Sequence, residues 1–254
     1  DLNAGTGNVI LVAGGSLNDA DAGDDITGTT ASIHAESGIG SDAQEIDTAV
    51  TNLAAQTESG DINIDNDGDL TITNMAGVTG VQIEDAGTDD SGADNITITA
   101  SSPLTVNDDV VNNDGGDISL TATESAGAGD DLTVATGVSI TAAGGTGSIS
   151  LDAGDDVVLN GTASVSAASS GGVSVTAASG DTDNAGAVTM SDNASVSSGS
   201  GAIDVDARDD ITIGSLSTSG NVDVTSSEGA IVDGGDAATD ISGATATLDA
   251  ATGI

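Results

Sequence analysis

Aliphatic residues recur along this chain in alternating pairs, with a single polar or small residue between the two members. A spacing of two places both aliphatic side chains on one face of a β-strand and the residue between them on the other. Each pair therefore predicts a short strand with an apolar inner face and a polar outer face. The pairs are Ile62/Ile64, Leu70/Ile72, Ile96/Ile98, Leu104/Val106, Ile118/Leu120, Leu132/Val134, Val138/Ile140, Ile149/Leu151, Val157/Leu159, Val173/Val175, Val188/Met190, Ile203/Val205, Ile211/Ile213 and Val222/Val224.

Gly, Asn, Asp and Ser separate these pairs, and they are the residues that favour turns. Strand starts often lie about eight residues apart, as at 149, 157, 165 and 173, and again at 188, 196, 203 and 211. Three such strands would make a rung of about 20 to 30 residues, which is typical of solenoid repeats. The pattern predicts an all-β fold, a parallel β-helix or β-solenoid with about three short strands per rung.

Three stretches depart from the alternation. Residues 39–58 carry Ile46, Val50, Leu53 and Ala54 at near-helical spacing, so a short helix or a loop excursion is an alternative to strands there. Residues 84–94 and 180–187 contain no aliphatic pair, and we expect loops that protrude from the rungs.

A longer repeat links the two ends of the sequence. Residues 7–39 begin GNVILVAGG and end TASIHAESGI, and residues 220–254 begin GNVDVTSSEG and end TATLDAATGI. We therefore expect residues 1–254 to form one continuous solenoid segment, about one unit of a tandem array, in which neither end resembles a cap.

The composition rules out an ordinary globular core. The chain has no Phe, Trp, Tyr or Cys, one Pro and 37 Gly. Without aromatic residues it must bury many small aliphatic side chains or stay unfolded, and the regular alternation argues against disorder. The absence of cysteine excludes a disulfide framework.

The net charge of −41 limits the partners. A surface this negative repels phosphate, so we expect neither nucleic acid nor an anionic membrane as a partner. A saline, calcium-containing exterior would screen the charge, which favours an extracellular or cell-surface location. No run of 18 or more apolar residues occurs, and Asp1 does not open a signal peptide, so an export signal would lie outside these residues.

Pairs of aspartates precede several predicted strands. They are Asp24/Asp25, Asp108/Asp109, Asp130/Asp131, Asp155/Asp156 and Asp209/Asp210. Paired carboxylates can serve as general acid and base, but these pairs recur at turns along the whole chain, and nothing in the sequence places them together in one cleft. They are expected to be solvated corner residues, and where corners stack, Asp155, Asp156, Asp209 and Asp210 could bridge rungs through divalent cations.

The densest set of oxygen ligands is the segment from Asp65 to Asp69. Its carboxylates, Asp65, Asp67 and Asp69, surround Gly68 and could converge on Ca²⁺. The glycine position does not fit an EF-hand loop and no Glu completes the set, so an ordinary turn between strands is the alternative. No cofactor is required by any motif in the chain, and Ca²⁺ is the ligand we expect if one binds.

Residues suited to catalysis are scarce. His34 is the single histidine and Arg208 the single Lys or Arg. A Ser/His/Asp arrangement would depend on His34, and sugar-active enzymes with a β-helix fold need basic or aromatic groups that this chain lacks. We therefore expect no enzymatic activity, and we expect His34 to be an exposed strand residue.

Several segments resemble the repeats of giant filamentous-haemagglutinin-like adhesins. They are GSISLDAGDDVVLNG at 147–161, GAIDVDARDDITIGS at 201–215, and the shorter stretches at 22–26 and 128–132. The resemblance covers nearly the whole chain. It implies a right-handed parallel β-helix, export across a Gram-negative envelope, and a role in adhesion, matrix or surface layers.

These observations lead to one expected function and two alternatives. We expect a structural segment of an extracellular fibre, sheath or filament whose partner is itself, head-to-tail or laterally. The first alternative is the shaft of a secreted adhesin that binds cell-surface or matrix glycans. The second is an ice-binding solenoid, suggested by outward Thr pairs such as Thr71/Thr73 and Thr97/Thr99, although β-propensity also explains them.

Overall fold

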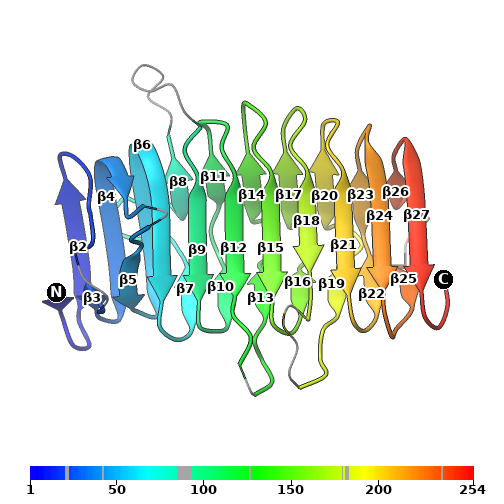
Figure 1. The fold of residues 1–254 in the computed structure, drawn as a ribbon, viewed down its shortest axis with the longest axis horizontal. Helices are drawn as coiled ribbons and strands as arrows, with labels where there is room; N and C mark the ends of the chain where they lie inside the picture. Colours follow the sequence, from blue (N-terminus) through cyan, green and yellow to red (C-terminus); the bar gives the residue numbers. More distant parts are fainter. Residues whose placement is uncertain are drawn as a thin grey trace.

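The computed structural model of the chain describes residues 1–20, 23–41, 43–84, 93–125, 127–178, 180, 183–235 and 237–254. Its strands form one 27-stranded sheet, all named pairings are parallel, and the described residues contain no helix. No described segment therefore offers an apolar helix of the length needed to cross a bilayer. The strands lie side by side along a long axis, with turns at both edges of the coil (Figure 1). The all-β, parallel solenoid predicted from the alternation is confirmed.

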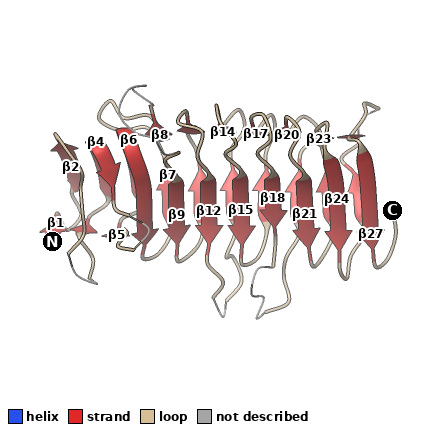
Figure 2. Ribbon diagram, turned by 45° about the horizontal axis from the view of Figure 1, so that its top comes forward, coloured by secondary structure: helices blue, strands red, loops and turns tan. Residues whose placement is uncertain are grey.

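From Leu70 onward each rung contributes one strand to each of three columns, and each strand pairs with its equivalents one rung before and after it (Figure 2). The first column holds β7 (Leu70–Ile72), β10 (Leu104–Val106), β13 (Leu132–Val134), β16 (Val157–Leu159), β19 (Val188–Met190), β22 (Ile211–Ile213) and β25 (Ile231–Asp233). The second holds β8 (Val81–Ile83), β11 (Val110–Asn112), β14 (Ser139–Ala142), β17 (Ser164–Ala167), β20 (Ser195–Ser198), β23 (Ser215–Ser217) and β26 (Ile241–Ser242). The third holds β9 (Ile96–Ala100), β12 (Ile118–Ala122), β15 (Ile149–Ala153), β18 (Val173–Thr176), β21 (Ile203–Ala207), β24 (Asn221–Ser226) and β27 (Thr245–Ala250).

The N-terminal rungs have a different cross-section, built from β1 (Leu2–Asn3), β2 (Asn8–Ala13), β3 (Ile26–Thr27), β4 (Thr30–Ile39), β5 (Ile46–Ala49) and β6 (Asn52–Asn66). There one long strand, β6, runs alongside three short strands of the next rung. The start of β6 pairs with β7 and β8, and its end pairs with β9. The prediction of three strands per rung therefore holds only beyond β6.

The interior is a single cluster of aliphatic side chains. Every member of the fourteen predicted pairs is buried. In the third column the register stacks Ile96 on Ile118 and Ile118 on Ile149, and the ladder continues through Val173 and Ile203. Burial of these small groups along a continuous column supplies the cohesion that aromatic residues provide in other folds.

The helical alternative for residues 39–58 is wrong. Ile46 lies on β5 and Leu53 and Ala54 lie on β6, while Val50 is at the turn between these strands. All four side chains are buried, but a tight turn between two strands produces their spacing. Asp42 lies outside the described residues.

The two expected loops are described only in part. Residues 85–92 and 181–182 lie outside the described residues. The described flanks, Glu84, Ala93, Asp94, Gly180 and 183–187, contain no strand, in agreement with the prediction.

Glycines stack at the corner that leads into the third column. A Cβ on any of the later members would overlap the carbonyl oxygen of the glycine one rung earlier. The stack consists of Gly116, Gly147, Gly171, Gly201 and Gly220. Close approach of successive backbones, rather than flexibility, therefore explains much of the glycine content at this corner.

Candidate functional site: carboxylates at the strand entries

Acidic and polar residues at the entries to the three columns accept hydrogen bonds from the next rung. At the entry to the third column the Asp61 carboxylate accepts from the Asn95 amide at 2.7 Å, and the Asn95 side chain accepts from the Asp117 amide at 2.8 Å. The Asp117 carboxylate then accepts from the Ser148 amide at 2.7 Å. Each polar side chain therefore satisfies a backbone N–H that the strand ladder does not reach.

The same arrangement recurs at the other two columns. Asp131 accepts from the Asp156 amide at 3.2 Å, and Asp156 accepts from the Ala187 amide at 2.7 Å. Asp109 accepts from the Ser139 amide at 2.7 Å in the second column. The aspartates that recur before the strands are thus turn residues whose carboxylates also bind backbone amides of the next rung.

The four aspartates proposed to bridge rungs through cations take different places. Asp156 and Asp210 accept backbone hydrogen bonds from the next rung, with Ala230 as the donor to Asp210 at 2.8 Å. Asp209 takes part through its backbone, as its carbonyl accepts from the Ser226 hydroxyl at 2.7 Å. Nothing in these contacts brings the four carboxylates to one ion, and cation bridging by them stays a prediction.

Asp155 differs from the other three because the residue is only 2% exposed. Its Oδ2 accepts from the amides of Gly129 and Asp130 in the preceding rung, at 2.5 Å and 3.0 Å. Its Oδ1 is buried and has no hydrogen-bond donor. Neighbouring Asp130 is also buried, and although burial raises its pKa, hydrogen bonds from Ser102 and Ser125 outweigh that effect and lower the pKa below its ordinary value.

The segment from Asp65 to Asp69 does not close on itself as a cation loop. Asp67 and Asp69 are exposed at the turn between β6 and β7. The buried Asn66 explains this turn, because its side chain accepts from Thr48 Oγ1 at 2.8 Å and donates to the Gly68 carbonyl at 3.0 Å. Of the three predicted carboxylates, only Asp65 belongs to a cluster.

That cluster joins Asp65 to Glu45 and Asp47. Each of the three residues offers a carboxylate oxygen, and these oxygens all lie within 4.8 Å of one another; no other such trio of His, Cys, Asp or Glu occurs among the described residues. The register explains the contact, because Asp47 of β5 is the ladder partner of Asp65 of β6. We refer to these three residues as the acidic cluster.

Both strand members of the acidic cluster are perturbed electrostatically. Partial burial raises the pKa of Asp47 above its ordinary value, and the negative charges of Asp65 and Glu45 raise it further. Burial and the Glu45 carboxylate likewise raise the pKa of Asp65, although a backbone hydrogen bond from Asn66 opposes the shift. The fold thus holds three acids together against their mutual repulsion.

Glu45 and Asp47 escaped the sequence analysis because they are distant from the Asp65 segment along the chain. Only the β5–β6 register brings them together, and the near-helical spacing of residues 39–58 concealed that strand pair. The alternation Ile46-Asp47-Thr48, with both Ile46 and Thr48 buried, is the signal that could have placed Asp47 on the outer face.

A second stacked acidic pair lies in the third column. Asp204 of β21 is the ladder partner of Asp223 of β24. Burial raises the pKa of Asp204, and the charges of Asp223 and Asp206 raise it further. The pair shows that repulsion between stacked acids is tolerated elsewhere in the coil.

Threonines also stack on the outer face of the first column, more regularly than their spacing in the sequence indicates. The register aligns Thr71, Thr105 and Thr133, and after Val158 it continues through Thr189 and Thr212. Such a row of β-branched residues stabilises parallel strands through side-chain packing. Each strand of this column is three residues long and has a single outward-facing position, so the threonines form one row and not two parallel rows.

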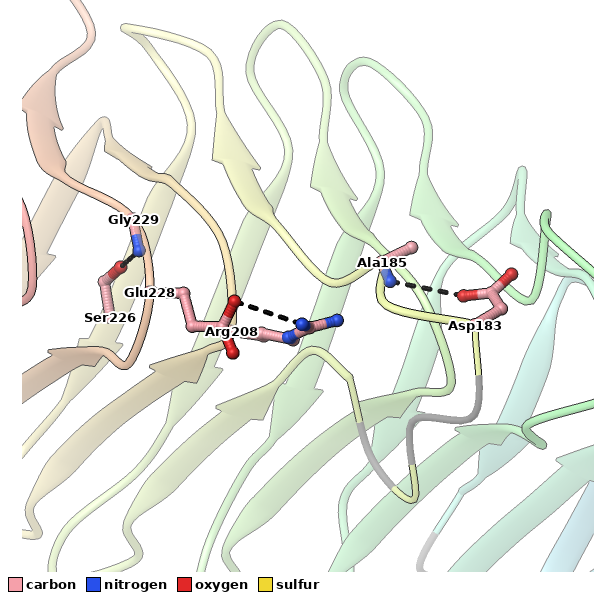
Figure 3. Close-up of polar contacts among 6 residues, drawn as sticks. All are labelled: Asp183, Ala185, Arg208, Ser226, Glu228 and Gly229. Atoms are coloured by element: carbon pink, nitrogen blue, oxygen red, sulfur yellow. Dashed lines mark hydrogen bonds and ion pairs between the residues drawn. The ribbon is translucent and has the colours of Figure 1, made fainter.

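The single histidine and the single arginine, on which catalysis would have had to depend, lie apart in the coil. His34 lies on a strand, β4, as expected, but it is half-buried rather than exposed; its ladder partners are Val12 and Gln56, neither of which is a carboxylate. Arg208 forms an ion pair with Glu228 at 3.0 Å (Figure 3). The Glu228 side chain is 59% exposed, so the ion pair is screened by solvent and adds little stability.

The comparisons with known proteins add no assignment. No family model matches the chain, and neither a curated protein nor a solved structure matches it. The resemblance to filamentous-haemagglutinin-like adhesins stays a prediction based on the quoted segments.

Proposed function

We propose that this chain is a non-catalytic structural segment of an extracellular or cell-surface fibre, in which further repeats continue the same coil. Its supporting observation is the equivalent placement of the two similar sequences. In the first copy Asn8 of β2 pairs with Thr30 of β4, and in the second copy Asn221 of β24 pairs with Thr245 of β27. A repeat that pairs in the same way in both places can be extended without a change of register.

The two copies agree on the inside and differ on the outside. Val9 and Leu11 correspond to Val222 and Val224, which face the core. The outward Ile10 of the first copy corresponds to Asp223 in the second. Retention of the inner face supports a role in which stacking matters more than any one surface residue.

The charge supports the same role. With 42 acidic residues against one basic residue, neighbouring coils repel each other laterally, whereas the parallel edges of successive rungs still pair along the axis. Growth along the axis without sideways aggregation is what a fibre segment requires.

The test is to express one, two and three copies of residues 7–219 in series and to image them by electron microscopy. We expect uniform rods whose length rises in proportion to copy number. Compact particles joined by flexible links would contradict the proposal. Antibody labelling of intact producing cells tests the location, and label that appears only after permeabilisation would contradict a surface fibre.

The adhesin shaft is the second candidate, and one feature favours it. The described residues between β12 and β13, 123–125 and 127–131, project beyond most neighbouring turns (Figure 1). On an otherwise regular coil such a projection could present side chains to a glycan or a receptor. Isolated stalks that end in knobs, together with glycan binding that is lost when this turn is shortened, would favour the adhesin over the fibre.

A further inference from the structure

A short turn interrupts the third-column side of the coil next to the acidic cluster. Ile39 pairs with Ile62, and Ile46 pairs with Ile64, so the turn that carries Gly40, Ser41, Gln44 and Glu45 lies opposite Asn63. Ser41 and Gln44 exchange backbone hydrogen bonds at 2.9 Å and 3.0 Å. Gly40 has φ +70°, and a Cβ there would overlap the Asn63 carbonyl oxygen, so the turn packs closely on β6.

The spacing of the acidic cluster suits one cation. Its three carboxylate oxygens lie within 4.8 Å of one another. Calcium–oxygen bonds are about 2.4 Å long, so two ligands on opposite sides of one ion are about 4.8 Å apart. All three carboxylates can therefore contact a single Ca²⁺ with little movement.

Asn63 provides a separate indication of a ligand. It is 4% exposed, and its buried Nδ2 has no hydrogen-bond partner. Asn63 lines the same hollow as Glu45 and Asp65, together with Ser41, Thr97 and Thr99. An unsatisfied amide is costly to bury. Rotation of the Asn63 side-chain amide by about 180° exchanges its oxygen and nitrogen, and the oxygen would then give a cation a fourth protein ligand.

The side chains around the hollow offer no balancing positive charge. Arg208 is the single Lys or Arg in the chain, and it is paired with Glu228 near the other end of the coil. We propose that Glu45, Asp47, Asp65 and the side-chain amide of Asn63 bind one Ca²⁺ ion, which fastens the turn that carries Ser41, Gln44 and Glu45 to β6.

The ligand chemistry favours Ca²⁺ over other common ions. All donors at the hollow are oxygens, whereas zinc sites usually include His or Cys. Mg²⁺ requires a nearly ideal octahedron and retains several waters, while Ca²⁺ accepts six to eight oxygens in irregular geometry. A site assembled from two strands and a turn suits the larger ion. The proposal does not depend on the fibre function, because a monomeric rod would bind the ion equally well.

The test is calorimetric titration of the full chain with CaCl₂ and, separately, with MgCl₂, in about 0.15 M monovalent salt to screen diffuse binding. We expect one saturable Ca²⁺ site with a stoichiometry near one, and weaker Mg²⁺ binding. Asp47→Asn and Asp65→Asn should each lower the Ca²⁺ affinity at least about tenfold. Asp223→Asn is the matched control, since it also removes one acid of a stacked pair, and it should leave the affinity unchanged.

Thermal unfolding separates an ion site from a purely structural role. In chelator, Asp47→Asn and Asp65→Asn should melt at or above the temperature of the parent chain, because each removes repulsion. In Ca²⁺, the parent should gain several degrees and the two variants should gain little. The proposal would be overturned if the titration detected nothing but weak Ca²⁺ binding at many sites, equal in all variants. It would also be overturned if Ca²⁺ raised the melting temperatures of the parent and of Asp65→Asn by the same amount.

Discussion

The smallest unit that organises this coil is a polar residue one position before a strand. Asp117 accepts a hydrogen bond from the Ser148 amide of the next rung, and its own amide donates to the Asn95 side chain of the rung before. One residue therefore links three rungs. This explains why aspartate and asparagine recur at strand entries although nothing in their local sequence reveals the partner.

Removal of that acceptor should weaken the coil. Asp117→Ala leaves the Ser148 amide without its partner and is expected to lower the free energy of unfolding by about 0.5–1.5 kcal/mol. Asp117→Asn retains an oxygen at the same position and should lose less. Urea unfolding of both variants measures the difference, and equal stability of the two variants would show that the hydrogen bond contributes nothing.

Stacked acids make the stability depend on pH in an unusual direction. Burial and the charges of Asp223 and Asp206 raise the pKa of Asp204 in the folded chain. The folded state then holds this proton more tightly than the unfolded state, whose aspartates titrate near about 3.9. This contribution is fully present below the unfolded pKa and is lost as pH rises through the folded pKa.

We therefore expect Asp204→Asn to reduce the loss of stability between about pH 4 and neutrality, and to stabilise the chain at pH 7 by about 0.2–1 kcal/mol. Urea unfolding across this range, in chelator, provides the measurement. Asp249→Asn is the control, because its ladder partner is Thr225 rather than an acid. An equal change of slope in both variants would refute the role of the stacked pair.

At the scale of the element, each corner depends on how closely two backbones approach. The glycine stack permits this approach where the chain enters the third column, and Gly171 lies in its middle. A methyl group at Gly171 would overlap the Gly147 carbonyl oxygen and separate two rungs.

Gly171→Ala is therefore expected to destabilise the coil by about 1–3 kcal/mol, the usual cost of overpacking. Gly14→Ala is the control, since no atom lies within 4 Å of a Cβ at that exposed position. Thermal unfolding compares the two variants. Equal melting temperatures would mean that the rungs can move apart at no cost.

The strands themselves were predictable from the sequence, whereas their partners were not. Alternation identifies Ile149 and Leu151 as inward-facing because a strand has only two faces. The partner of a strand depends on the length of the turns, and the inter-rung hydrogen bonds differ in span, with 20 residues between donor and acceptor at Asp210 and 34 at Asp61. Sequence spacing alone therefore could not align Asp47 with Asp65, or Thr71 with Thr105.

The stretch near Ile46 shows the limit of periodicity. Aliphatic residues separated by a tight turn mimic the spacing of a helix, although they belong to β5 and β6. Gly40, whose positive φ and close approach to Asn63 demand glycine, marked the turn but did not reveal its partner. Candidate ligands that depend on this turn were missed for the same reason.

At the scale of the whole molecule, aliphatic columns run the length of the coil beneath an acidic surface. Each rung contacts mainly its neighbours, so cohesion accumulates along one axis. The same one-dimensional order makes extension by further repeats feasible, and it fixes the distance between any two rungs.

That distance is the most direct test of the account. The chain has no cysteine, so spin labels can be attached at introduced Thr71→Cys with Thr212→Cys, and at Thr71→Cys with Val232→Cys. These outward positions lie in one column, separated by about five and about six inter-rung steps of about 4.8 Å. Pulsed electron–electron double resonance should give narrow distributions of the distance between labels, centred at about 24 Å for the first pair and at about 29 Å for the second, each to within about one rung. Broad distributions, or no increase from the first pair to the second, would contradict the stacked coil.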